Sequence, residues 1–535
     1  MSLGITRRRL LAMSAAALSA GMARAAGPVS VPVPPLRPEY VPPKPKQPWE
    51  KMIEEARLDG KTSFIVMDAA SGEVVQEHNA HVGLPPASVV KALTALYAVD
   101  VLGGEHVFET KILGTGYLDA GGALKGDLIL CGGGDPELTT DGLGDLSKQL
   151  VELGITSITG RLLVWGGALP FEERIDRNQP EHVAYNPSVS GIMLNRNRVR
   201  FEWVRRSGEY DLRLDARSGR YTADVTVAEI TAKERMGQVY TYDDLGGTDG
   251  WTVAKAALGK GGARWLPTRQ PLAYAGEVFR AVAAQNGLEL PKAETTETLP
   301  EDSFIMAKRE SPILSKILKD MLKYSYNLTA EAVGMAASAK RLGRPVSMAE
   351  SAREMNRWAR EKFGVIGIDQ VDHSGLGDRS RIAPKALAAL LAHPWCKDTL
   401  VPLIKMKAVA MSKGTIKKWH KTGTLHYASG LAGYLEMPSG RELSFAIFSV
   451  DFDRRKRADL KGSERPPGSK SWGQRARHLQ NRLIKSWAEG CAAPSWPRDN
   501  SPLRAFEQDK PVGLERHVTC ARAAFDRCGV EPIDI

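Results

Sequence analysis

The 535-residue sequence has few features that bind metals, redox partners or nucleic acids. Its five cysteines form no Cys-x-x-Cys pair and have no histidine at zinc spacing, so neither a structural zinc site nor dithiol redox chemistry is expected. No basic helix or stacked-aromatic motif points to a nucleic-acid partner. Beyond residue 22, no stretch is apolar enough to cross a bilayer. We therefore expect a protein that needs no metal and no organic cofactor. The cysteines are Cys131, Cys396, Cys491, Cys520 and Cys528.

Residues 1–25 have the composition of a secretory signal peptide. Three arginines at positions 7–9 precede a short apolar core, and an Ala-x-Ala exit ends at Ala25. Paired arginines before Leu-Leu resemble a twin-arginine export signal. We expect cleavage after Ala25 and export to the periplasm, where Cys520 and Cys528 could form a disulfide.

Basic residues exceed acidic ones by 73 to 62, a net charge of +11 at neutral pH. Cleavage after Ala25 would remove four arginines and leave 11 − 4 = +7. A moderate excess of this kind favours a polyanionic neighbour, such as a cell wall or a lipid headgroup surface. At most, peripheral association with a membrane is expected.

Changes in composition and in predicted secondary structure divide the chain into parts. Residues 26–48 are rich in proline and predict an extended linker. Residues 49–104 combine a strand hairpin with a buried helix, and 105–266 carry short strands between glycine-rich turns. Residues 267–488 return to helices and end in a hairpin that we expect at a sheet edge, and the tail, 489–535, has no assigned function. The middle part is interpreted as a β-rich insertion that divides one domain.

Ser88 and Lys91 lie at the start of the buried helix in the first part. Positions i and i+3 share a helix face, so the hydroxyl lies beside the amine. A serine hydroxyl becomes a nucleophile when a base removes its proton, and burial lowers the pKa of a lysine far enough to serve as that base. Ser-x-x-Lys is a common sequence, and by itself this pair could be accidental.

Two further motifs follow in order. Ser325-x-Asn327 lies at the end of a helical stretch, within the part expected to be helical over residues 311–342, and Lys421-Thr422-Gly423 lies on the first strand of the late hairpin. Ser-x-x-Lys, Ser-x-Asn and Lys-Thr-Gly each occur once in the chain. Together they are the motif set of serine enzymes that acylate on the first serine. Taken singly, each has a structural explanation, as a helix cap, a solvated strand charge and a bulge glycine.

With these motifs the chain resembles the serine-active penicillin-binding proteins. It is most similar to the low-molecular-mass class C group, the D-alanyl-D-alanine carboxypeptidase/endopeptidases. The first two motifs are 325 − 88 = 237 residues apart, where that family has a β-rich insertion. Other family-like segments are Gly126-Asp127-Leu128, Gly133-Gly134-Asp135-Pro136, Tyr185-Asn186-Pro187 with Asn195-x-Asn197, and Asp372-His373-Ser374-Gly375-Leu376.

The resemblance covers about residues 51–486 and implies an α/β (α+β) fold. The expected catalytic domain is like that of serine β-lactamases and transpeptidases, an antiparallel sheet flanked by helices, and the β-rich insertion splits it in sequence. One departure is Gly377-Asp378, where the family usually has a serine after Ser-Gly-Leu. We expect this change to alter a loop near the site.

The resemblance also implies a role for each motif residue. Ser88 attacks the bond between two D-alanines, Lys91 is the general base, and Ser325 relays the proton to the leaving nitrogen. Asn327 holds Lys91 and the substrate amide. Lys421 lowers the pKa of Lys91 by its like charge and binds the terminal carboxylate.

The remaining expected site residues bind substrate. Thr422 and Thr424 assist in holding the carboxylate, and the backbone N–H of Thr424 forms an oxyanion hole with that of Ser88. Gly423 allows the substrate backbone to approach the strand. Asp135 is expected to meet the free amino group of a cross-linking diamino acid.

The substrates implied are peptidoglycan stem peptides, with β-lactam antibiotics as covalent inhibitors. One alternative is a β-lactamase or serine esterase with the same motifs, which the long insertion disfavours. A second is a non-catalytic protein that binds the wall or senses β-lactams, which the intact motifs disfavour.

Overall fold

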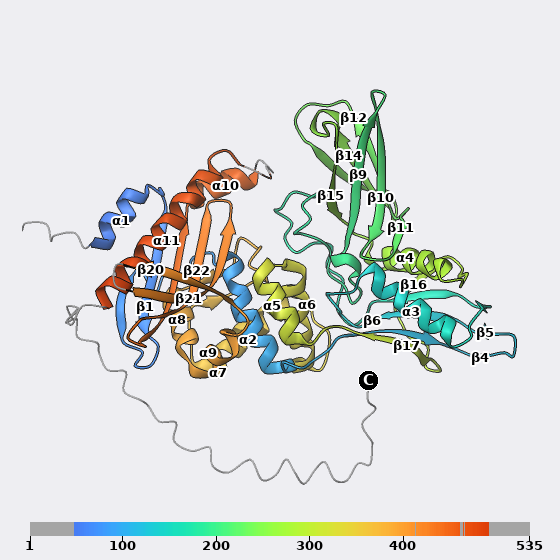
Figure 1. Ribbon diagram of the computed structural model, residues 1–535, viewed down its shortest axis with the longest axis horizontal. Coiled ribbons are helices and arrows are strands. Elements are labelled where there is room, and N and C mark those ends of the chain that lie inside the picture. Colours follow the sequence, from blue (N-terminus) through green and yellow to red (C-terminus); the bar gives the residue numbers. More distant parts are fainter. Residues whose placement is uncertain (1–47, 412–413, 461–463, 465, 492–535) are drawn as a thin grey trace, which may run out of the picture. The chain divides into compact units, whose positions relative to one another are not determined.

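The computed structural model describes residues 48–491, except 412–413, 461–463 and 465. An antiparallel six-stranded sheet forms the centre of the domain that contains both ends of this part of the chain (Figure 1). Its strands are β1 (Lys61–Asp68), β2 (Val74–His78), β20 (Lys405–Met411), β21 (Gly414–Leu425), β22 (Ala428–Glu436) and β23 (Glu442–Val450). Their order is β2-β1-β23-β22-β21-β20.

Helices cover both faces of this sheet because successive side chains of a strand point to opposite faces. On β23, Phe448 and Val450 enter one core and Phe445 and Ile447 enter the other. The first core contains side chains of α2 (Val90–Leu102), α5 (Leu314–Tyr324), α6 (Asn327–Leu342), α7 (Met348–Phe363), α8 (Pro384–Ala392) and α9 (Pro394–Leu400). The second contains side chains of α1 (Pro48–Ala56) and α11 (Ser469–Cys491). Smaller elements are β18 (Ile368–Asp369), β19 (Arg381–Ile382) and α10 (Phe452–Leu460).

The central helix α2 is apolar on all sides, and every side chain from Val90 to Ala98 is buried. A helix of this composition lies inside a domain, since it has no polar face to present to water. A 3₁₀ turn, Ala87–Val89, precedes it. The helix expected near Ser88 is therefore present, and its first turn lies within the protein core.

The late hairpin is not at the edge of the sheet as expected. β20 pairs with β21, from Lys405 opposite His420 to Met411 opposite Gly414, and forms the edge itself. The exposed lysines of β20 made this strand hard to recognise, although charged side chains are common on edge strands. Because β20 begins opposite His420, the last residues of β21, from Lys421 on, extend beyond it.

The segment between α2 and α5 contains four further sheets and a core of its own. One sheet has the order β16-β8-β6-β3-β17, and the others are β11-β10-β9-β15, β12-β14-β13 and β4-β5-β7. The strands are β3 (Glu109–Gly114), β4 (Tyr117–Leu118), β5 (Ala123–Lys125), β6 (Leu128–Gly132), β7 (Ser157–Ile158), β8 (Leu162–Trp165), β9 (Arg198–Arg206), β10 (Glu209–Arg217), β11 (Thr222–Asp224), β12 (Ala228–Lys233), β13 (Tyr240–Asp244), β14 (Asp249–Ala254), β15 (Gly261–Pro267), β16 (Ala293–Thr296) and β17 (Phe304–Glu310). The helices are α3 (Thr140–Glu152) and α4 (Pro271–Gln285).

This insertion continues beyond the expected boundary at residue 266. β17 pairs with β3 along its length, and Val278 and Phe279 of α4 pack in the same core as Leu146 of α3. The insertion therefore ends near Glu310. An apolar stripe predicts that a helix is buried but not which core receives it, so the pattern of α4 did not reveal the boundary.

The expected α/β fold, an antiparallel sheet flanked by helices, is confirmed. Within the described ranges, no helix combines the length and apolar character needed to span a bilayer. Cys131 and Cys396 are buried free thiols. The predicted signal peptide, most of the linker and the tail, and the Cys520–Cys528 pair lie outside the described residues.

Candidate active site

Ser88 lies in the 3₁₀ turn that leads into α2 and is half-buried. The preceding Ala87 has φ 47°, a left-handed conformation that is uncommon for residues with a side chain. The turn is tightly enclosed: a Cβ on Gly423 would lie 2.4 Å from the carbonyl oxygen of Pro86, and one on Gly375 would lie 2.0 Å from that of Ala87. The absence of a side chain at Gly423 thus makes room for this turn, and the expected approach of the substrate backbone to the strand stays a prediction.

Lys91 is buried, and its Nζ donates three hydrogen bonds. The acceptors are Oγ of Ser88 at 3.0 Å, Oδ1 of Asn327 at 2.7 Å and the carbonyl oxygen of Ser374 at 2.7 Å. Burial, reinforced by the charge of Lys421, holds the pKa of Lys91 well below its usual value. A lysine in contact with the hydroxyl and with a lowered pKa is suited to act as its general base.

Ser325 lies at a break in the helix expected over residues 311–342. The chain takes a left-handed conformation there, with φ 62°, so that α5 ends and α6 begins at Asn327. The break directs Ser325 towards β21, where its Oγ accepts a hydrogen bond of 3.1 Å from Nζ of Lys421.

Lys421 and Gly423 are buried on β21, whereas Thr422 and Thr424 are exposed. The Lys421 Nζ also donates to the carbonyl oxygen of Thr422 at 2.8 Å. Burial lowers the pKa of Lys421 to about 8. An ammonium group thus lies beside Ser325, next to two accessible threonines.

The five predicted motif residues therefore form two hydrogen-bonded groups that meet where α5 ends and α6 begins. Ser88, Lys91 and Asn327 form one group, and Lys421 with Ser325 forms the other. A hydroxyl, a buried amine and an amide in direct contact are suited to nucleophilic acyl transfer.

Three groups in the site were missed by the sequence analysis. Glu331, one turn after Asn327, accepts hydrogen bonds from the backbone N–H groups of His373 and Ser374, at 3.0 and 2.9 Å. Burial and the nearby Asp372 raise its pKa to about 8. A lone acid among the small and apolar residues of α6 was the signal that could have identified it.

Asp372 has a similar supporting role in the following loop. Its carboxylate accepts from the N–H groups of Gly375 at 2.7 Å and of Gly377 at 2.6 Å. Burial raises the pKa of Asp372 above its usual value. The glycine that departs from the family pattern, Gly377, is thus part of the turn that holds Ser374 against Lys91.

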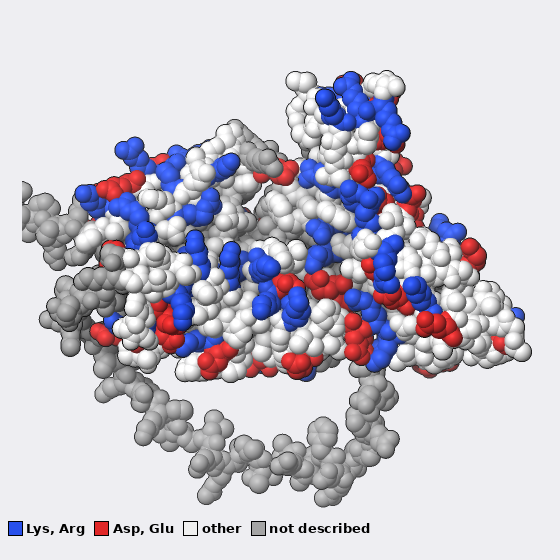
Figure 2. All heavy atoms as spheres, viewed as in Figure 1, with Lys and Arg blue, Asp and Glu red and all other residues white. Residues whose placement is uncertain are grey.

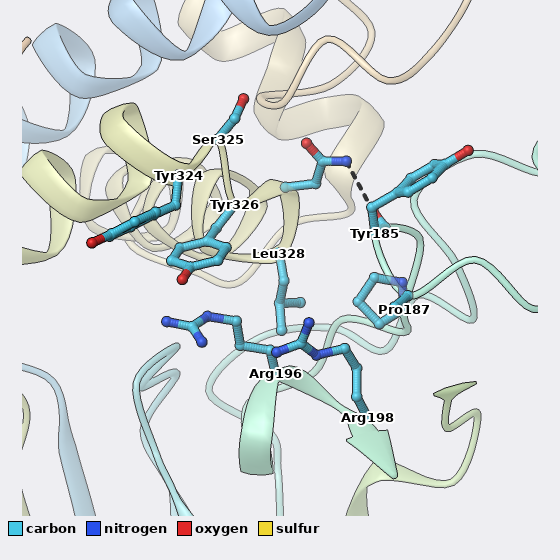
Figure 3. Close-up of a pocket in the computed structure, with 10 residues that line it drawn as sticks. Tyr185, Pro187, Arg196, Arg198, Tyr324, Ser325, Tyr326 and Leu328 are labelled. Carbon is cyan, nitrogen blue, oxygen red and sulfur yellow. Dashed lines mark hydrogen bonds between the residues drawn. The ribbon is translucent and has the colours of Figure 1, made fainter. Parts of the chain in front are cut away.

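The insertion supplies the third group. The Nδ2 of Asn327 donates to the carbonyl oxygen of Tyr185 at 2.9 Å (Figure 3). Because Oδ1 of the same amide accepts from Lys91, Asn327 connects the insertion to the lysine. The sequence shows Tyr185-Asn186-Pro187 only as a family-like segment, with no sign that its backbone contacts the site.

Among the described residues, the contacts of Asp135 are with Arg309 and Glu137 and not with the motif residues. Its side chain is 1% exposed and forms an ion pair with Arg309 at 2.5 Å, and its Oδ1 accepts from the N–H of Glu137 at 2.8 Å. A carboxylate that is buried and paired in this way is not available to a substrate ammonium group. The geometry therefore argues against the predicted role of Asp135.

A family model described as the D-Ala-D-Ala carboxypeptidase 3 (S13) family matches residues 46–463. The chain belongs to this family. The S13 match includes the first part of the divided domain, the whole insertion and the second part as far as residue 463, and it confirms the resemblance inferred from the three motifs.

Two relatives with related sequences support the assignment of this chain to the S13 family. The chain is 26% identical over 440 residues to a D-alanyl-D-alanine carboxypeptidase of Actinomadura sp. (strain R39), covering 74% of this chain and 79% of the relative. It is 23% identical over 413 residues to the D-alanyl-D-alanine carboxypeptidase DacB of Haemophilus influenzae, covering 72% and 84%.

Solved structures show the same fold as this S13 chain. The crystal structure of penicillin binding protein 4 (dacB) from Haemophilus influenzae has a TM-score of 0.64 and 19% identity, covering 82% of this chain and 100% of that one. The same protein in complex with a β-lactam has a TM-score of 0.63, 21% identity and the same coverage.

Proposed function

We propose that this protein is an exported serine D-alanyl-D-alanine carboxypeptidase that acts on peptidoglycan stem peptides through an acyl-enzyme on Ser88. The contact between Ser88 Oγ and Lys91 Nζ, 3.0 Å apart, carries the proposal. A second activity, cleavage of cross-links as a DD-endopeptidase, uses the same chemistry with a longer leaving group. The periplasm is the compartment in which such substrates are found.

Acylation begins when neutral Lys91 takes the proton of Ser88. The Oγ forms a bond to the carbonyl carbon between the two D-alanines, and the negative charge moves to the carbonyl oxygen, where the N–H groups of Ser88 and Thr424 stabilise it. The C–N bond then breaks. Ser325 passes a proton to the leaving nitrogen and receives another from Lys421, whose Nζ donates to it at 3.1 Å. Lys91 then gives up the proton taken from Ser88, through solvent, to Lys421, so that Lys91 is neutral and Lys421 charged again. D-alanine departs as the amine.

The free edge of β21 supports binding of an extended peptide. β20 is paired with β21 only as far as His420, so the backbone of the following residues is open on that side and can pair with a substrate strand. Lys421, together with the hydroxyls of Thr422 and Thr424, then receives the terminal carboxylate.

Deacylation regenerates Ser88. Neutral Lys91 takes a proton from a water molecule, whose oxygen bonds to the ester carbon. The bond between that carbon and Oγ then breaks, Lys91 returns the proton to Oγ, and the peptide leaves as a carboxylic acid shortened by one residue. A β-lactam would acylate Ser88 in the same way, but its amine remains tethered to the acyl group after ring opening. Slow hydrolysis of that adduct would make penicillin an inhibitor.

Ser88→Ala tests this mechanism, with Ser71→Ala, an exposed serine of the β1–β2 turn, as the matched control. We expect Ser88→Ala to release no D-alanine from an acylated peptide ending in D-alanyl-D-alanine and to take up no fluorescent penicillin. Ser71→Ala should behave as the wild type. Labelling that persists in Ser88→Ala would exclude Ser88 as the nucleophile. Rapid turnover of the penicillin adduct would instead identify a β-lactamase.

A further inference from the structure

A cavity of about 230 Å³ lies beside Ser325 and Asn327 (Figure 3). One wall is the segment that joins α5 to α6, and the other comes from the insertion. The residues on the insertion side are Ala184, Tyr185, Pro187, Arg196 and Arg198. In Figure 3 the side chains of Arg196 and Arg198 extend from the insertion towards Tyr326 and Leu328. Two cationic groups therefore line a hollow that begins at the proposed catalytic residues.

Arg196 is held in place by neighbours on two sides. Its Nη2 donates to both carboxylate oxygens of Glu137, at 2.9 and 2.8 Å, and its guanidinium lies 3.8 Å from the ring centroid of Tyr326. The charge of Arg196 is therefore largely balanced, and the stacked ring fixes its plane.

The charge of Arg198 is not balanced by a carboxylate in the way that Glu137 balances that of Arg196. Its Nε donates to the carbonyl oxygen of Asn195 at 3.3 Å, and its guanidinium lies 5.3 Å from the ring centroid of Trp265. Within the residues that the structure describes, no carboxylate forms an ion pair with it. Burial and the charge of Arg196 lower the pKa of Arg198 to about 10. A desolvated guanidinium beside a second one is stabilised when an anion approaches.

A second cavity, of about 180 Å³, shares Arg196 and Arg198 with the first. It is also lined by Arg217 and Trp265 and extends into the insertion towards Pro136. The two arginines thus stand between two hollows, with space for a ligand that continues from the catalytic residues into the insertion.

The unpaired charge of Arg198 is not part of a general excess of basic residues on the surface. On the face in Figure 2, Lys and Arg are interspersed with Asp and Glu, and most arginines of the insertion have a carboxylate partner, for example Arg213 with Asp224 and Arg220 with Asp145. An arginine that is half-buried, unpaired and directed into a cavity is therefore a local feature of this site.

We propose that Arg198, aided by Arg196, binds a second carboxylate of the peptide substrate, on the acyl side of the bond that is cut. This inference rests on the proposed function, in which Lys421 takes the terminal carboxylate, so the two anionic groups bind at separate places. The planar guanidinium of Arg198 matches a carboxylate through two parallel N–H donors. The enzyme would then distinguish stem peptides with free side-chain or α-carboxylates from those in which these groups are amidated.

Matched peptides test the proposal. Each pair consists of two N-acetylated peptides that end in D-alanyl-D-alanine and differ only in having glutamate or glutamine at one position. That position is one residue before the first D-alanine in the first pair and two residues before it in the second. For the wild type we expect kcat/KM for D-alanine release to be about tenfold higher with glutamate in one of the pairs. Arg198→Met, which keeps an apolar side chain beside Trp265, should abolish this preference, so that kcat/KM is the same for the glutamate and the glutamine peptide.

The control is Arg206→Met, at the exposed end of the same strand, which should keep the preference. Equal rates with glutamate and glutamine at both positions in the wild type would overturn the inference, and so would a preference that survives in Arg198→Met. Unchanged penicillin labelling of Arg198→Met would show that the catalytic centre is intact.

A binding measurement separates this inference from the proposed function. Calorimetric titration of Ser88→Ala with the same peptides requires no turnover. About tenfold tighter binding of the glutamate peptide in one pair supports the carboxylate site, and equal affinities in both pairs exclude it. Failure of the proposed function would appear differently, as wild-type protein that releases no D-alanine from any of the peptides.

Discussion

The Nζ of Lys91 donates a hydrogen bond of 2.7 Å to the Oδ1 of Asn327, a residue 236 positions later in the chain. An amide oxygen can hold the lysine in position without adding a negative charge beside it. That neutrality matters, because a carboxylate at the same place would favour the protonated amine, which cannot act as a base.

Asn327→Asp should therefore slow acylation by making the base harder to deprotonate. The added carboxylate raises the pKa of Lys91, so less of the neutral amine is present at neutral pH. We expect the rate of penicillin acylation at pH 7 to fall by about tenfold or more and to recover as the pH rises. Stopped-flow measurement of the pH profile tests this, with the exposed Asn178→Asp as control. If the acylation rate of Asn327→Asp fell at low pH over the same pH range as that of the wild type, the predicted rise in the pKa of Lys91 would be contradicted.

Lys421 should control the recognition of the terminal carboxylate, and do so in a pH-dependent way. Because burial lowers its pKa to about 8, its positive charge is lost as the pH rises above about 8. KM for a carboxylate-ended peptide should increase over this range, while KM for the matching amide should change little. Lys421→Ala should raise KM for the carboxylate peptide by about 10- to 100-fold more than for the amide. Equal losses would remove Lys421 from this role.

Gly423→Ala should impair activity through backbone crowding. The new Cβ would lie 2.4 Å from the carbonyl oxygen of Pro86 and 3.0 Å from the N of Ser88, so β21 must move away from the nucleophile. We expect a loss of kcat of at least tenfold, with a decrease in unfolding free energy of about 1–3 kcal/mol. Gly473→Ala in α11, where a Cβ meets only the end of Arg477 at 3.5 Å, should keep full activity. Wild-type rates for Gly423→Ala would disprove the close approach.

Asp135→Asn should reduce stability and leave substrate choice unaltered. The substitution leaves the charge of Arg309 without its buried partner, and breaking one side of such a pair costs about 3–5 kcal/mol. Chemical denaturation measures this cost. Relative rates on peptides with free and acetylated diamino side chains measure selectivity. A changed selectivity would restore the role in amine recognition that the structure argues against.

Glu331→Gln should change how stability depends on pH. The pKa of Glu331 in the folded protein is raised to about 8 from an ordinary value of 4.5. Between these two values the folded state therefore holds a proton that the unfolded state has released, and the unfolding free energy falls as the pH rises. Glutamine cannot titrate, so this component, at most about 1.4 kcal/mol per pH unit, should be missing from the variant. Parallel wild-type and variant curves would exclude a raised pKa.

The sequence was sufficient to identify the family and the motif residues, because their chemistry requires particular side chains at fixed spacings. The buried helix after Ser88 and the late hairpin that contains Lys421 were also recognised, since their apolar patterns are long and regular. These features depend on local composition and could be inferred without any tertiary information.

Other features depend on contacts between distant segments and left no local pattern. The left-handed turn at Ser325 interrupts a helical pattern. The strand β20 has two lysines among apolar residues and is exposed or partly exposed throughout, so it lacks the pattern of a buried strand. The burial of Asp135 depends on Arg309, which is 174 residues away. Glu331 is an isolated acid whose partners, the N–H groups of His373 and Ser374, lie on another segment.

The pairing of β1 with β23, in which Lys61 lies opposite Val450, has a consequence for how the molecule is made. The strand β1 can complete its pairing only after β23 has been synthesised, almost 400 residues later. Such long-range closure is slow and leaves strand edges unprotected in the meantime. A ribosome-bound or truncated chain that ends before β23 should therefore be unable to complete the sheet, whereas the insertion, with its own core, can fold earlier.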